Sequence, residues 1–167
     1  MPPNLYIIGT MNTADRSIEA LDTALRRRFS FIELAPDPSL LSKNVEGINL
    51  VLLLTTINRR IECLLDRDHC IGHSFLMGIA SIDELRSAFQ NKIMPLLREY
   101  FYNNAAKVGM VVGKAFVRPN TDGGVGSNRF AAGTWGDGDV EIRELYDFVD
   151  VGKVDAEGFK SIYGGED

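Results

Sequence analysis

The most informative stretch of the sequence is residues 4–29, NLYIIGTMNTADRSIEALDTALRRRF. It opens with an apolar run at 5–8 that is rich in strand-forming residues and ends at Gly9, so we predict a buried strand over 4–9. A polar turn follows, and apolar residues at helical spacing then predict a helix over 16–28, which ends in consecutive arginines. Open α/β sheets bind ligands at the carboxyl ends of their strands, so this polar turn is a candidate site.

The chain changes character at the prolines that follow. A second strand is predicted at 29–34, and Pro36 and Pro38 then exclude regular pairing. Beyond them the apolar spacing predicts helices over 44–66, 82–94 and 95–102. Ser81 and Glu84 form a capping box, and Pro95 restarts the helix. The valine- and glycine-rich segment 108–117 is compatible with helix or strand. We therefore expect a sheet part that ends at residue 35 and a helical part over 36–118.

The rest of the chain, 119–167, is predicted to be a C-terminal extension. Residues 120–138 contain many glycines and few apolar residues, which indicates a loop. A last strand within 140–149 and a short helix at 159–163 follow.

Four segments resemble one known family. They are GTMNTADRS at 9–17, ALRRRF at 24–29, IGHSF at 71–75 and PLLREYF at 95–101. In this order they are similar to the second half of the AAA-plus NTPase core of the McrB type, the GTP-driven motor of restriction systems that cut methylcytosine-containing DNA. The resemblance implies an α/β fold, with the remnant of a P-loop AAA-plus parallel sheet at 1–35 and a mainly helical lid at 36–118.

The sequence lacks the two motifs that such a motor needs to hold its nucleotide. No segment fits G-x-x-x-x-G-K-[ST], whose backbone and lysine cradle the phosphates, and no apolar run ends in the paired acids of a Walker B strand. We therefore expect the C-terminal part of a McrB-like subunit only. By itself it should neither hydrolyse nor tightly bind a nucleotide.

The polar turn supplies the first candidate residues. The resemblance places Asn12 at sensor 1, where its amide would bond the γ-phosphate and the attacking water; the alternative is a turn asparagine that bonds its own backbone. Asn12 and Asp15 have the N-x-x-D outline of an element that reads guanine. A helix cap or an ion pair with Arg16 is the more ordinary role for Asp15. Arg16 is expected near the nucleotide or a neighbouring subunit.

The arginine cluster supplies the second set. The resemblance implies that Arg27 or Arg28, ahead of Arg26, reaches the nucleotide of an adjacent subunit as an arginine finger. A guanidinium there spreads positive charge over the transition-state oxygens. The alternative is electrostatic capping of the helix C-terminus. Contact with DNA phosphate is disfavoured by the net charge of −5.

The IGHSF segment supplies the third. The resemblance implies that His73 and Ser74 approach the nucleotide, where a neutral histidine can bond a phosphate or ribose oxygen; the alternative is a packing histidine. His73 also lies near His69, Cys63 and Cys70, but their spacing fits no common zinc module, so we expect no metal site. A buried, helical Cys63 and a loop Cys70, both reduced, are expected instead.

The composition is typical of a globular domain without a membrane-spanning segment. The chain is 45% apolar and 25% charged, and its longest apolar-dominated run is too short to span a bilayer, so we expect a cytoplasmic protein. The resemblance further implies a ring, hexameric in the family, GTP or ATP with magnesium in the complete assembly, an endonuclease partner of the McrC kind, and only indirect contact with DNA. The alternative is an oligomerisation or regulatory module, for example a homodimer joined through the strand edges at 4–9 or 29–34.

Overall fold

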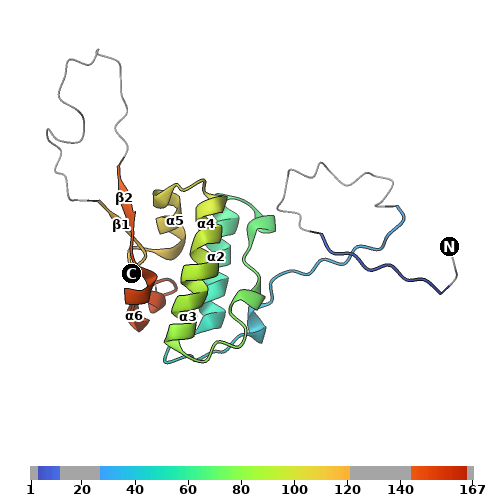
Figure 1. Cartoon of the computed structure of the whole chain (residues 1–167), viewed down its shortest axis with the longest axis horizontal. Helices are drawn as coiled ribbons and strands as arrows, with labels where there is room; N and C mark the ends of the chain where they lie inside the picture. The colour runs from blue at the N-terminus through green and yellow to red at the C-terminus, as the bar shows by residue number, and fades with distance from the viewer. Residues whose placement is uncertain (1–3, 12–26, 121–143, 165–167) are drawn as a thin grey trace, which may run out of the picture.

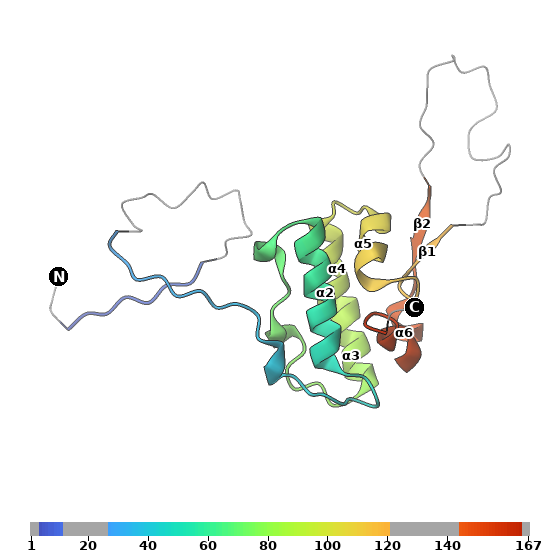
Figure 2. The same cartoon turned by 180° about the vertical axis from the view of Figure 1, so that it is seen from behind.

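The computed structural model describes residues 4–11, 27–120 and 144–164. These residues form a helical body, a two-stranded sheet packed beside it, and an extended N-terminal region. We call residues 27–36 the arm. Figure 1 shows the arm leaving the helical body and running away from it, and Figure 2 shows the sheet and α6 on the opposite side of the body.

Helix α2, Leu50–Leu64, is the central helix of the body. The side chain of Asn49 caps it by accepting from the N–H groups of Val51 and Leu52. Its buried positions recur at helical spacing: Leu50, Leu53, Leu54, Ile57 and Ile61. The prediction of a helix from residue 44 was wrong at its start. Residues 45–48 instead make a tight bridged turn in which Glu46 and Gly47 have φ of 50° and 85°, a left-handed backbone that a helix cannot contain.

Helices α3, Ile82–Ala88, and α4, Met94–Tyr100, are joined by a π-helical turn, Phe89–Ile93. Ser81 caps α3 as predicted, since its hydroxyl accepts from Glu84 N–H at 3.3 Å, and Glu84 accepts in return from Ala80 N–H at 2.8 Å. The predicted restart at Pro95 is confirmed, because Pro95 lies in the first turn of α4. The widened π turn relieves the clash between a proline ring and the preceding turn.

The ambiguous segment 108–117 is mostly helix. Helix α5, Ala105–Val112, ends at Gly113, whose φ of 86° suits a residue without a side chain. Strand β1, Val117–Pro119, follows and pairs antiparallel with β2, Tyr146–Phe148. Helix α6, Ala156–Lys160, begins three residues before the helix predicted at 159–163 and is the last helix among the described residues.

One hydrophobic core unites the body with the described part of the C-terminal extension. Phe89, Phe116 and Phe159 are fully buried and mutually in contact, with Phe159 edge-on to the other two at 5.1 and 5.3 Å between ring centroids. Val151, Val154 and Ile162 are buried in the same cluster. Residues 144–164 are therefore packed against the helices.

The strands predicted at 4–9 and 29–34 are not formed. The described residues in both ranges have no regular structure, and Ile8, Ile32 and Leu34 are 94%, 84% and 89% exposed. A strand is stabilised by the strand beside it, and the only sheet among the described residues is the β1–β2 pair. The helix predicted at 16–28 and the loop predicted at 120–138 lie almost wholly outside the described residues. Within the described ranges, no helix has both the length and the apolar character needed to cross a membrane.

Candidate functional site

The arm meets the helical body at Pro36-Asp37-Pro38. The Asp37 carboxylate caps the 3-10 turn Pro38–Leu40, where Oδ1 accepts from Ser39 N–H at 3.0 Å and from the Ser39 hydroxyl at 2.6 Å. These bonds to Ser39 are the main reason that the pKa of Asp37 lies below its ordinary value. On its other side, the Asp37 N–H donates to Nδ1 of His73 at 3.0 Å. The junction therefore joins residues 36 positions apart in the sequence.

The IGHSF segment is held in place by α2. The Asn58 side chain accepts from Ile71 N–H at 2.7 Å and donates to Ile71 C=O at 2.9 Å, so it satisfies both backbone groups of one residue. Ile71 and Leu76, on either side of His73, are each 1% exposed. His73 is therefore carried on a turn with buried residues at both ends.

The turn before IGHSF is fixed by a second set of contacts. Asp66 caps the 3-10 turn Arg67–His69, and its Oδ1 lies 2.6 Å from Nδ1 of His69. The His69 ring meets Tyr100 of α4 edge-on at 4.9 Å between centroids. Burial raises the pKa of Tyr100, and burial followed by the nearby Glu62 carboxylate raises the pKa of the Cys70 thiol. Both shifts favour the neutral form of the side chain.

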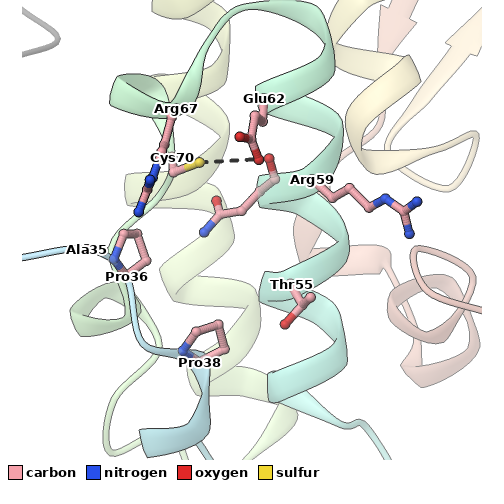
Figure 3. A pocket seen from close by; sticks show the side chains of 9 residues that line it. Ala35, Pro36, Pro38, Thr55, Arg59, Glu62, Arg67 and Cys70 are labelled. Atoms are coloured by element: carbon pink, nitrogen blue, oxygen red, sulfur yellow. Dashed lines mark hydrogen bonds between the residues drawn. The ribbon is translucent and has the colours of Figure 1, made fainter.

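An open hollow of about 260 Å³ lies between the arm and α2. Figure 3 shows Arg67 directed toward Ala35 and Pro36 of the arm, while Arg59 points away from Cys70. Arg67 also pairs with Glu33 of the arm at 3.3 Å. The residues that line the hollow are Ala35, Pro36, Pro38, Thr55, Asn58, Arg59, Glu62, Arg67 and Cys70. Of these polar groups, Arg67 bonds the arm through Glu33, whereas Asn58 bonds the backbone of Ile71, and none of them forms a nucleophile–base pair.

His73 and Ser74 do not meet at one site. His73 faces the arm, whereas Ser74 is exposed and lines a second hollow, of about 370 Å³, over α3 and the π turn. That hollow is bordered by Ser74, Phe75, Met77, Gly78, Ile79, Glu84, Ser87, Ala88, Asn91 and Lys92. The two neighbours predicted as one nucleotide contact therefore belong to different surfaces of the body.

Two of the three clustered arginines lie among the described residues. Arg27 and Arg28 are exposed in a turn at the start of the arm. Asn12, Asp15, Arg16 and Arg26 lie outside the described residues. Cys63 is exposed on α2, which corrects the expectation that it is buried. Among the described residues, no three His, Cys, Asp or Glu side chains gather where they could hold a metal ion.

Sequence reasoning missed Asn58 and Asp37. A signal for Asn58 was present, since it stands beside the buried positions Ile57 and Ile61 of α2, where a polar side chain needs a partner. Asp37 also carries a signal, because it holds the one N–H between two prolines. Neither signal names the partner, which lies far along the chain.

Comparison with known families decides what the helical body is. Residues 49–109 match the family model described as McrB, alpha-helical lid domain. Residues 49–109 form a McrB-type lid. The match begins at the N-cap of α2 and ends within α5. It therefore contains Asn58 with its two bonds to Ile71, the IGHSF turn, and helices α3 and α4. The sequence-based recognition of a McrB-like chain is confirmed.

Two curated relatives extend the match beyond the lid. The chain is 38% identical to the Type IV methyl-directed restriction enzyme EcoKMcrB subunit of Escherichia coli (strain K12), over 64% of this chain and 28% of that protein. It is 30% identical to the Type II restriction enzyme BsuMI component YdiS of Bacillus subtilis (strain 168), over 70% of this chain and 36% of that protein. The matched regions thus span about a third of these relatives, both of which are restriction-system components.

Proposed function

We propose that this chain is part of a McrB-like AAA-plus NTPase that drives a DNA restriction complex. In this proposal, residues 49–109 are the lid and residues before 36 belong to the end of the α/β core. The observation that carries the proposal is the McrB-type lid match at 49–109, which follows in the same chain an arm that bears exposed arginines. GTP or ATP with magnesium is the fuel of the complete assembly.

Arg27 or Arg28 is the proposed arginine finger. Their exposure leaves them accessible to a neighbouring subunit. They are the first residues of the arm, which runs away from the lid (Figure 1). A planar guanidinium that neutralises the transferring phosphoryl oxygens increases the rate on the order of a thousandfold or more. Arg26 is the third member of the cluster and has the same chemistry.

The remaining nucleotide contacts are proposed from the family resemblance. Asn12 is sensor 1 and aligns the attacking water, while Asp15 and Arg16 lie beside it. His73 accepts from Asp37 N–H at Nδ1, so its neutral ring carries its proton on Nε2. The Nε2–H group can then donate to a phosphate or ribose oxygen of the nucleotide. Ser74 offers a hydroxyl from the neighbouring surface.

The missing phosphate loop and Walker B acids come from other sequence in this proposal. The segments at 4–9 and 29–34 then become strands of the completed parallel sheet, which would bury apolar side chains that are exposed here, Ile8 and Ile32 among them. Assembly into a ring and an endonuclease partner of the McrC kind are part of the same proposal. The membership of both relatives in restriction systems supports it.

The test is nucleotide hydrolysis after mixing this chain with a Walker-A-bearing N-terminal half of the same motor. We expect hydrolysis only in the mixture, and we expect Arg27→Ala with Arg28→Ala to abolish it. Arg118→Ala, which removes an exposed arginine from β1, is the matched control and should leave the rate unchanged. Hydrolysis by the chain alone, or full activity in the double variant, would contradict the proposal.

A second candidate is a self-associating interaction module. The apolar side chains exposed at 5–8 and 31–34 favour it, since exposed strand-forming segments recruit other strands. Light scattering after size exclusion separates the two candidates. A stable homodimer that ignores nucleotide and does not bind the N-terminal half would favour the module.

A further inference from the structure

We propose that His73 is a positioning residue: its hydrogen bond to Asp37 sets the direction in which the arm leaves the lid, and so the position of Arg27 and Arg28. We call the bond between Nδ1 of His73 and the Asp37 N–H the latch. The structural half of this proposal stands on the described residues. Only its last step, the effect on hydrolysis, rests on the proposed function.

The latch acts on a stiff piece of chain. Pro36 and Pro38 have no N–H and a fixed φ, and each restricts the residue before it to extended backbone. Asp37 has φ −116° and ψ 92°, an extended backbone. Its N–H is therefore the single backbone donor between residues 36 and 38. Because the flanking backbone has little freedom, fixing this one N–H fixes the path of the chain that enters the arm.

The other partner of the latch is equally well held. Two backbone hydrogen bonds close the turn around His73, from Phe75 N–H to Gly72 C=O at 3.2 Å and from Leu76 N–H to His73 C=O at 3.0 Å. The turn is anchored at Ile71 by the Asn58 side chain of α2. A continuous series of contacts thus runs from α2 through His73 to Asp37. Movement of the lid is passed to the arm through this series.

Among the described residues, the ion pair between Arg67 and Glu33 also joins the lid to the arm. Its members are 67% and 71% exposed and lie 3.3 Å apart. Such pairs are held by long side chains in water and contribute little to a fixed geometry. The latch instead joins a half-buried ring, on a turn with buried residues at both ends, to the exposed N–H of Asp37, so neither partner moves on a long side chain. The latch therefore determines the arm's direction, and the ion pair does not.

Three substitutions at one position separate the acceptor from the rest of the histidine. In His73→Asn the side-chain oxygen takes the place of Nδ1, so the latch is kept. In His73→Gln the amide lies one bond further out, near the place of Nε2, and His73→Ala has no acceptor. Arg67→Ala removes the ion pair and is the matched control.

The first measurement uses this chain alone. Amide hydrogen exchange of Asp37, followed by NMR, should be about tenfold faster in His73→Ala and His73→Gln, the factor expected for one lost hydrogen bond, and unchanged in His73→Asn and Arg67→Ala. Unfolding curves confirm that each variant is folded. Equal exchange in all four variants would overturn the latch.

The second measurement reads the arm's direction. Spin labels at Cys63 and at Ser30→Cys, in a chain that also carries Cys70→Ser, report the distance between lid and arm. We expect a broader distribution in His73→Ala than in the parent and in His73→Asn. A distribution that broadens with Arg67→Ala, and not with His73→Ala, would assign the coupling to the ion pair and overturn the proposal.

The third measurement uses the mixture with the Walker-A-bearing half. We expect His73→Ala to lower kcat by about ten- to a hundredfold, since a misplaced finger acts on the transition state, and His73→Asn to restore kcat. Both variants lack the proposed Nε2 contact with the nucleotide, so any change in KM should be the same in both. A kcat that His73→Asn does not restore would assign the whole effect to the nucleotide contact and overturn the positioning role. If no mixture hydrolyses nucleotide, the proposed function fails, while exchange and distance still decide the latch.

Discussion

The side chain of Asn58 bonds both the N–H and the C=O of Ile71, at 2.7 and 2.9 Å. One amide thus pairs with a loop backbone as a neighbouring strand would. Ile71 is 1% exposed, so water cannot take the place of either bond. The consequence is that the segment between α2 and α3 is fixed at the point from which His73 reaches the arm.

We expect Asn58→Ala to destabilise the lid by about 2–4 kcal/mol, because it leaves a buried N–H and a buried C=O without partners. Urea unfolding followed by circular dichroism measures the change. Asn91→Ala is the control, since Asn91 is exposed on the π turn and bonds only the Ser87 hydroxyl at 3.2 Å, and it should change stability by less than about 0.5 kcal/mol. Equal losses of unfolding free energy in both variants would show that the two bonds of Asn58 stabilise the lid no more than an exposed side-chain bond does.

Local signals predicted the lid well. Ser81 and Glu84 mark the start of α3, Pro95 lies in the first turn of α4, and the spacing of apolar residues identifies α2, because each signal acts within one or two turns of helix. The start of α2 was missed, since the left-handed residues Glu46 and Gly47 interrupt an apolar pattern that by itself continues.

Features that depend on distant partners were not predictable. The segments at 4–9 and 29–34 have strand-forming residues, but a strand also needs a neighbour, and the described residues supply none there. His73 was singled out through the family resemblance, whereas its partner Asp37 lies 36 residues away and carries no matching pattern. The C-terminal residues that complete the core were likewise assigned to an extension, because their contacts with Phe89 and Phe116 span much of the chain.

The end of α4 carries an unfavourable backbone that a substitution should relieve. Tyr102 has φ of 51° and is 94% exposed, at a helix C-terminus where glycine is preferred. We expect Tyr102→Gly to stabilise the chain by about 0.5–1 kcal/mol in a thermal unfolding experiment. Tyr102→Ala removes the ring but keeps the Cβ atom and should give no gain. A loss in Tyr102→Gly would mean that the ring makes a contact worth more than the relief.

Phe159 tests whether the C-terminal residues belong to the lid's core. It is fully buried between Phe89 and Phe116, so Phe159→Ala should cost about 3–5 kcal/mol and unfold with the helices in one transition. Leu145→Ala, at a position that is 53% exposed, is the control and should be nearly neutral. Separate transitions for α6 and the helices of 49–109 would show that the two parts fold independently.

Arg98 of α4 joins the helical body to β2. Its guanidinium carbon lies 3.9 Å from the centre of the Phe148 ring, and among the described residues its Nε is the one buried side-chain nitrogen or oxygen without a hydrogen-bond partner. A double-mutant cycle with Arg98→Met and Phe148→Leu should give a coupling energy of about 0.5–2 kcal/mol. Additive effects would reduce the pair to ordinary packing.

The Asp37 carboxylate gives the junction a defined pH dependence. Its bonds to the Ser39 hydroxyl and N–H, in that order of weight, favour the charged form and hold the pKa of Asp37 below its ordinary value. Since the folded pKa lies below the unfolded one, the stabilising contribution of the charged carboxylate is present above the unfolded pKa and is lost as pH falls through the folded pKa.

An NMR titration of the Asp37 carboxyl carbon should therefore show a depressed midpoint. Asp37→Asn keeps the acceptor oxygen but cannot titrate, so it should remove this part of the acid sensitivity. A midpoint at or above the ordinary aspartate value, or the same acid sensitivity in Asp37→Asn, would show that the cap is absent in solution.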